Sequence, residues 1–206
     1  MNLSDVDSLL RLVDREVWIV AAAQGGSKAG LTATWVSQVS LDADRPMLLA
    51  GLAPNHATTA MVRNAGYFSL HLLARSQAPL AFRFASGSSR EINKFEGIPE
   101  VAGPAGTPKI LGCVAWFECK VVASYDAGDR EFFWGEVVAG DGDVQGIPLR
   151  QSEFFSGLTE AEKQVLRLDR AQDIEIQKAG RDAWLKSQEK GSGARADVAN
   201  RWYAGS

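Results

Sequence analysis

The sequence predicts a mainly β protein of the α+β class, built as a small closed antiparallel barrel. About six segments have the length and composition of strands, and most follow one another across short turns. The expected helices are fewer than the strands and do not alternate with them, which argues against a parallel βαβ sheet. With 206 residues, one such domain leaves some chain over for a terminal extension.

The first expected hairpin follows a short helix over 5–13 that Ser4 would cap. It joins an apolar strand, 17–23, to a longer strand, 31–41, across a glycine-rich turn. The longer strand carries small polar side chains on both faces, whereas a half-buried strand usually keeps them on the solvent side. The strand therefore either lies at a sheet edge or lines the binding site of a polar ligand.

The remaining elements follow in chain order. We expect strands at 47–52, 67–73, 110–125 and 131–140, and helices at 57–64 and 77–85. Residues 98–109 are rich in proline and glycine and predict an irregular stretch. Residues 158–188 are highly charged and predict one or two helices, followed by a polar tail. The chain thus divides into a barrel domain, 1–150, and a helical C-terminal extension, 151–206.

The composition is typical of a soluble globular protein, with 46% hydrophobic and 23% charged residues. A formal net charge of -3 predicts no surface for nucleic acid or an anionic membrane. Cys113 and Cys119 lack the spacing of a metal or redox motif, which indicates a reducing compartment. No signal peptide is visible, and no apolar run reaches the roughly 20 residues that cross a bilayer. We therefore expect a cytoplasmic protein.

No sequence motif for a phosphate-binding loop, a metalloprotease or a serine hydrolase is present. Two histidines and two cysteines also make a zinc site unconvincing. The polar groups that remain suit an organic cofactor carrying a phosphate, because loop amides beside a lysine or arginine bind phosphate. They are the hydroxyls of Thr32, Thr34, Ser37 and Ser40, the small loop 86–89, and the charges of Arg90 and Lys94.

Two of these candidates have structural alternatives when each is taken alone. Lys94 is compatible with a solvated surface charge, and Trp35 with a place in the barrel core. Only the combination of hydroxyls, small loop, lysine and planar side chains favours a cofactor site.

Four stretches of the chain resemble, in order and spacing, the flavin reductase-like, FMN-binding split-barrel family. They are GLTATWVSQVSL, PMLLAGLAPNHATTAMV, YFSLHLLARSQAPLAFRFASGSSREINKF and LGCVAWFECKVVASYDAGDREFFWGEVV. The resemblance covers the chain from about Val17 to Val138. It implies a six-stranded antiparallel split β-barrel with interposed helices, usually a homodimer with FMN near the subunit interface.

The resemblance also implies which residues bind FMN. The ring would lie against the strand at 34–37, the loop at 53–56 would border it, and Lys94 would neutralise the phosphate. The FMN-binding residues expected on this basis, together with the hydroxyl set above, are Thr32, Thr34, Trp35, Val36, Ser37, Ser40, Ala53, Pro54, Asn55, His56, Thr58, Ser86, Ser88, Ser89 and Lys94. No metal is expected.

The implied function is an oxidoreductase that transfers hydride from NAD(P)H to flavin and on to free flavin, a partner oxygenase or another acceptor. Because a flavin performs this chemistry itself, no catalytic acid or base of the protein is expected. One alternative is a non-enzymatic FMN-binding electron carrier or redox-responsive module, and another is a related split barrel with a deazaflavin or haem. The family's Gly-Asp-His is Gly128-Asp129-Arg130 here, so Arg130 either attracts a dinucleotide phosphate or is a plain turn residue.

Overall fold

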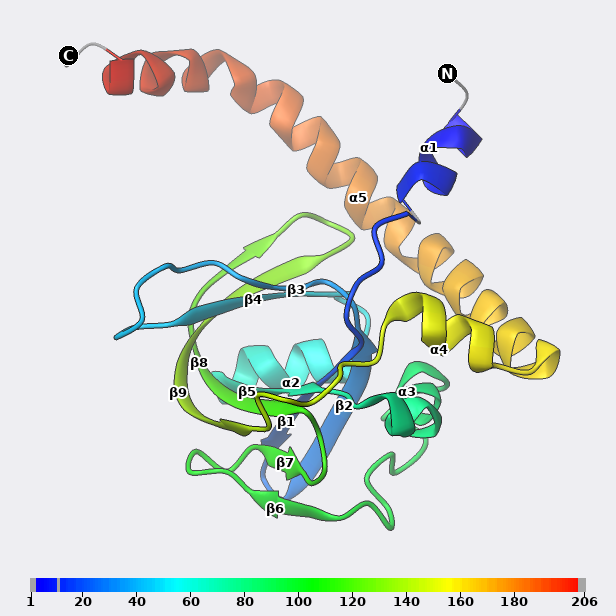
Figure 1. Ribbon diagram of the computed structural model, residues 1–206. Helices are drawn as coiled ribbons and strands as arrows, with labels where there is room; N and C mark the ends of the chain where they lie inside the picture. Colours follow the sequence, from blue (N-terminus) through cyan, green and yellow to red (C-terminus); the bar gives the residue numbers. More distant parts are fainter. Residues whose placement is uncertain (1–2, 11, 204–206) are drawn as a thin grey trace.

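A computed structural model describes residues 3–10 and 12–203 (Figure 1). Its main feature is a seven-stranded, fully antiparallel sheet in the spatial order β2-β1-β5-β8-β9-β4-β3, curled into a half-barrel. The strands are β1 (Trp18–Gln24), β2 (Ser27–Ala33), β3 (Val36–Gln38), β4 (Met47–Leu52), β5 (Tyr67–Leu72), β8 (Ala115–Asp126) and β9 (Glu131–Gly142). The predicted α+β class and antiparallel barrel are confirmed.

The long strand expected at 31–41 is interrupted after β2 and resumes as β3, with only Thr34 and Trp35 between them. These two strands nevertheless form opposite edges of the sheet. The Trp35 carbonyl already accepts a hydrogen bond from the Gly51 amide of β4, at 2.9 Å. One bent strand therefore connects the two edges of the curled sheet. Counting it once gives the six strands that were predicted.

The stretch predicted to be irregular contains a small separate hairpin, β6 (Glu100–Ala102) and β7 (Pro108–Ile110). The turn of this hairpin is held by hydrogen bonds to Glu118 of β8, whose carboxylate is fully buried. Glu118 accepts hydrogen bonds from the amides of Ala105 and Thr107 and from the Thr107 hydroxyl. This support comes from a residue outside the stretch, so local sequence patterns did not indicate it. The following strand begins at Ala115 and not at 110, because Gly112 (φ 79°) turns the chain.

The helices are α1 (Leu3–Leu10), α2 (Ala57–Ala65), a 3-10 turn η1 (Arg75–Gln77), α3 (Ala78–Ala85), α4 (Gln151–Gly157) and α5 (Glu160–Tyr203). Helix α2 ends as expected at Gly66, whose left-handed backbone lets its amide bond the Val62 carbonyl. Two expectations were wrong. Helix α1 already includes Ser4, and α5 continues through the Gly191–Gly193 segment, where a polar tail was expected. The division into domains at residue 150 stays a prediction.

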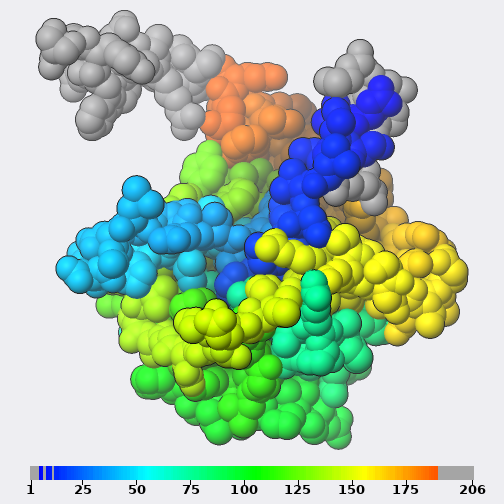
Figure 2. Space-filling view, in the orientation of Figure 1, coloured from blue at the N-terminus to red at the C-terminus, as the bar shows by residue number. Residues whose placement is uncertain are grey.

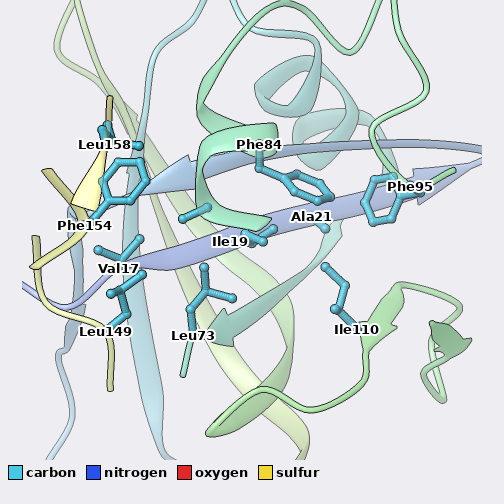
Figure 3. Packing of buried hydrophobic residues seen from close by; sticks show 11 residues of the cluster. Val17, Ile19, Ala21, Leu73, Phe84, Phe95, Ile110, Leu149, Phe154 and Leu158 are labelled. Atoms are coloured by element: carbon cyan, nitrogen blue, oxygen red, sulfur yellow. The ribbon is translucent and has the colours of Figure 1, made fainter. Parts of the chain in front are cut away.

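Strand β1 is buried on both faces, so its apolar side chains belong to two hydrophobic clusters, one on each face. On the outer face, Val17, Ile19 and Ala21 pack with α3 and α4, as Figure 3 shows around Phe84. On the inner face, Val20 and Ala22 pack inside the barrel with side chains from β2, β4, β5, β8, β9 and α2. The outer cluster fixes α3, and with it the loop that follows α3, against β1 and β2.

Helices α4 and α5 form a ridge along one side of the molecule, coloured yellow to orange in Figure 2. Figure 1 shows α5 passing beside the barrel and then extending away from it. Among the residues that the structure describes, no helix has an apolar stretch long enough to cross a membrane.

Candidate cofactor site

A cavity of about 360 Å³ lies where β2, the loop after β4, the loop after α3 and α5 meet. Its volume is within the range of small-molecule sites. Seven of the predicted residues line it: Thr32, Asn55, His56, Thr58, Ser88, Ser89 and Lys94. Three separate chain segments thus converge on one cavity, as the prediction required.

Lys94 lies at this cavity with only 3% of its surface exposed. Its Nζ donates a hydrogen bond to the Phe84 carbonyl at 2.9 Å, and an ammonium has two further hydrogens to donate. Burial lowers the pKa of Lys94 to about 8, although the negative charge of Asp169 partly opposes this shift. The alternative of a solvated surface lysine is therefore wrong. A buried ammonium facing a cavity is suited to bind an anion.

The loop after α3 is tied to the neighbouring walls of the cavity. Ser89 Oγ donates to the Gly30 carbonyl of β2 at 3.0 Å, and Arg90 donates to the Asn55 carbonyl at 2.9 Å. Gly87, in a left-handed conformation (φ 63°), directs its amide to the Asp169 carboxylate of α5. The loop therefore offers an amide and a lysine at the same end of the cavity.

Asn55 and His56, in the loop between β4 and α2, are both bound by α5. The Asn55 amide nitrogen donates to Asp173 at 2.8 Å, and its oxygen accepts from Gln177 at 3.0 Å. His56 Nε2 lies 2.9 Å from the other Asp173 oxygen. Burial alone would raise the pKa of Asp173, but the hydrogen bonds from His56 and Asn55 bring it below its ordinary value. Asp173 is therefore a carboxylate at neutral pH.

Trp35 and Arg130 form a second contact with α5, outside the cavity. The Arg130 guanidinium lies over the Trp35 ring, 4.9 Å from its centroid, and donates to Gln177. Trp35 is 46% exposed, so its alternative place in the barrel core is wrong. Arg130 is more than a plain turn residue, because it joins the bend between β2 and β3 to α5.

The other predicted residues do not line the cavity. Ser37 donates its hydroxyl to the Gln38 carbonyl, Ser40 accepts from the Asp42 amide, and Ser86 donates to the Phe82 carbonyl. Outside the cavity with them are Thr34, Trp35, Val36, Ala53 and Pro54. For these eight residues, contact with a cofactor stays a prediction.

Sequence reasoning missed the wall that α5 contributes, which consists of Asp169, Gln172, Asp173 and Ile176. These residues belong to a highly charged helix, and charges of this kind usually face solvent. Gly180 is the one unusual feature in this part of the helix, since glycine is unfavourable in a helix interior.

The polar groups of the cavity fit one end of a phosphorylated cofactor. Lys94, the Gly87 amide and the Ser88 hydroxyl are donors around a single region, and Ser89, which donates to the Gly30 carbonyl, lines the same region. Within the described residues, no group of three or more His, Cys, Asp and Glu side chains could hold a metal ion. The donors named above are of the kind that bind an anion.

Comparison with known proteins agrees with this geometry. The family model for the flavin reductase-like domain matches residues 10–150 of this chain. The chain is 32% identical over 130 residues to the NADH-dependent FMN reductase SmoA of Agrobacterium fabrum, an alignment that covers 62% of this chain and 71% of that protein. It is 33% identical to the reductase component of a 4-nitrophenol monooxygenase from Rhodococcus opacus, covering 65% and 68% of the two chains.

A solved structure shares the fold. The NADH:FAD oxidoreductase SgcE6 of Streptomyces globisporus superposes with a TM-score of 0.65 at 25% identity, over 73% of this chain and 90% of its own. The share of a relative's length that this chain matches differs widely: it is 24% for a diflavin flavoprotein of Nostoc and 74% for the NADH-dependent FAD reductase of Streptomyces globisporus. Because the family model covers well over half of the sequence, the chain belongs to the flavin reductase-like domain family.

Proposed function

We propose that this chain binds FMN in the cavity beside Lys94 and acts as an NAD(P)H-dependent flavin reductase. The observation that carries the proposal is the nearly buried Lys94 ammonium, which faces a cavity lined by loop donors in a chain of this family. A buried cation with one carbonyl partner is stabilised when an anion such as a phosphate joins it.

The bound flavin would accept hydride and pass on electrons by its own chemistry. The protein's residues bind and orient it. Lys94 and the Gly87 amide would hold the phosphate, while Ser88 adds a hydroxyl donor and Ser89, whose hydroxyl donates to the Gly30 carbonyl, fixes the loop. Asn55 and His56 would border the ring end, and both have side-chain polar groups for the flavin edge. The strand bend at 34–37 would contribute further contacts, as the family resemblance implies.

We further propose that the reduced flavin serves a partner oxygenase or another acceptor. This follows the Rhodococcus relative, which is named as the reductase component of a monooxygenase. The A. fabrum relative is named for NADH, so NADH is the first nicotinamide to test. We take FMN as the flavin to test first, because one buried ammonium, that of Lys94, lines the cavity and the A. fabrum relative is named as an FMN reductase. A homodimer and a cytoplasmic location stay predictions.

The decisive experiment mixes the FMN-loaded protein with NADH, and separately with NADPH, in the absence of oxygen. A reductase loses the absorbance of oxidised flavin within seconds of mixing. Persistence of the oxidised spectrum with both donors would favour the non-enzymatic electron carrier. Added free FMN in excess then tests onward transfer, because turnover continues until the excess is reduced as well.

A further inference from the structure

Helix α5 occupies one wall of the proposed flavin cavity, although it lies beyond residue 150, where the family model ends. Asp169, Asp173 and Ile176 all reach the cavity from this helix. Two of these three are acidic, in a cavity whose opposite side carries Lys94 and the Gly87 amide. The helix therefore brings negative charge to a place where a phosphate is proposed to bind.

The Asp169 carboxylate interacts with the Gly87 amide and the Lys94 ammonium, the two groups proposed to bind the phosphate. One of its oxygens accepts the Gly87 amide at 3.2 Å, and its charge acts on the Lys94 ammonium. A flavin phosphate carries close to two negative charges at neutral pH. It is repelled by the carboxylate and requires the same donors, so the two anions compete for one subsite.

From Leu168 onward the contact between α5 and the barrel is mainly polar, whereas Leu166 packs against the outer cluster and holds the start of the helix. Asp173 and Gln177 bind Asn55 by hydrogen bonds, while the apolar side chains of Leu168 and Ile176 remain 60% and 53% exposed. A helix that buried its apolar face would be held far more firmly.

A close approach of α5 to the barrel depends on two glycines. A Cβ atom on Gly180 would lie 2.5 Å from the Gly128 carbonyl oxygen, and one on Gly128 would lie 2.4 Å from the Gly180 oxygen. No side chain fits at such distances. The glycine inside α5, unfavourable for the helix itself, is explained by this docking contact.

We propose that α5 is an acidic strap whose Asp169 carboxylate competes with the flavin phosphate for the anion subsite, so that flavin binding displaces the helix. The inference rests on the proposed function, because it takes this cavity as the flavin site. Flavin binding and strap docking are then linked equilibria: weakening the docking strengthens flavin binding, by the same factor as long as the docked state predominates.

The test uses variants of the whole 206-residue chain and titrates each with FMN and with riboflavin, following flavin fluorescence. Asp169→Asn removes the competing charge, and Gly180→Ala removes the docking contact without changing any charge. Glu175→Gln, on the exposed side of α5, and Gly157→Ala, where a Cβ meets nothing within 4 Å, are matched controls. Both test variants should bind FMN roughly five-fold more tightly or better than wild type, as a coupling of ordinary size allows.

In the same variants, riboflavin should show little gain from Asp169→Asn, because it has no phosphate. Amide hydrogen exchange in α5 should also accelerate when wild-type protein binds FMN. FMN affinities equal to wild type, or weaker in both test variants, would overturn the strap while leaving the reductase assignment intact. Absence of flavin binding in every variant would overturn the strap and the proposed function together.

Discussion

Lys94 keeps an ammonium group in a nearly buried position, where a charge is destabilising unless an anion compensates it. Replacing it with alanine should weaken FMN binding by about 1–3 kcal/mol through loss of a charge-assisted contact. Lys94→Met, which keeps most of the apolar stem, is the control for packing and should weaken FMN binding equally. Calorimetric titration measures both, and an unchanged FMN affinity in both variants would remove Lys94 from the phosphate site.

The pKa of the same residue predicts a pH dependence. Burial lowers the pKa of Lys94 from 10.5 to about 8, so the side chain is charged below about pH 8 and becomes neutral above it. FMN affinity should therefore be constant near neutral pH and fall as the pH rises through 8 to 10. Bound phosphate favours the ammonium, which moves the midpoint in the complex upward. Riboflavin affinity, measured in parallel, should lack this decrease.

At the scale of elements, the packing of β9 against the barrel interior requires glycine. A Cβ on Gly135 would lie 2.5 Å from Phe68 Cζ and 2.6 Å from Cys119 Cβ. Gly135→Ala should lower the free energy of unfolding by about 1–3 kcal/mol through overpacking. Gly157→Ala at the end of α4, where space is open, should change it little. Denaturant unfolding compares the two, and equal stabilities would contradict this account of the barrel interior.

The elements also show what the sequence could predict. Strands β1 and β9 and the turn between β8 and β9 were expected close to their observed bounds, because apolar alternation and turn residues are local signals, whereas β8 begins later than expected because Gly112 turns the chain. The bend at Thr34–Trp35 was missed, since it depends on pairing with β4, which no local pattern encodes. Lys94 and Asn55 were placed together through family resemblance, whereas Asp169 was missed because its role depends on how α5 docks.

At the scale of the whole molecule, we predict a two-fold homodimer. Several large apolar side chains of the β8–β9 hairpin are half-exposed, among them Val122, Tyr125 and Val138. A second copy would bury such a surface. Sedimentation should give twice the chain mass, and the double variant Val122→Glu, Val138→Glu should sediment as a monomer. Val144→Glu, in an exposed turn, is the control. A monomeric wild type at micromolar concentration would contradict the prediction.

The bent strand that joins β2 to β3 has a consequence for how copies of this chain can meet. An unpaired edge strand can form main-chain hydrogen bonds with a strand of another chain, which is a common route to aggregation. Here one border strand leads directly into the other across two residues, and β3 itself is only three residues long. The other border strand, β2, lies against α3 and the loop after it, where the Ser89 hydroxyl bonds both main-chain groups of Gly30. Association between copies must therefore rely on side chains, which gives the sequence control over which surfaces join.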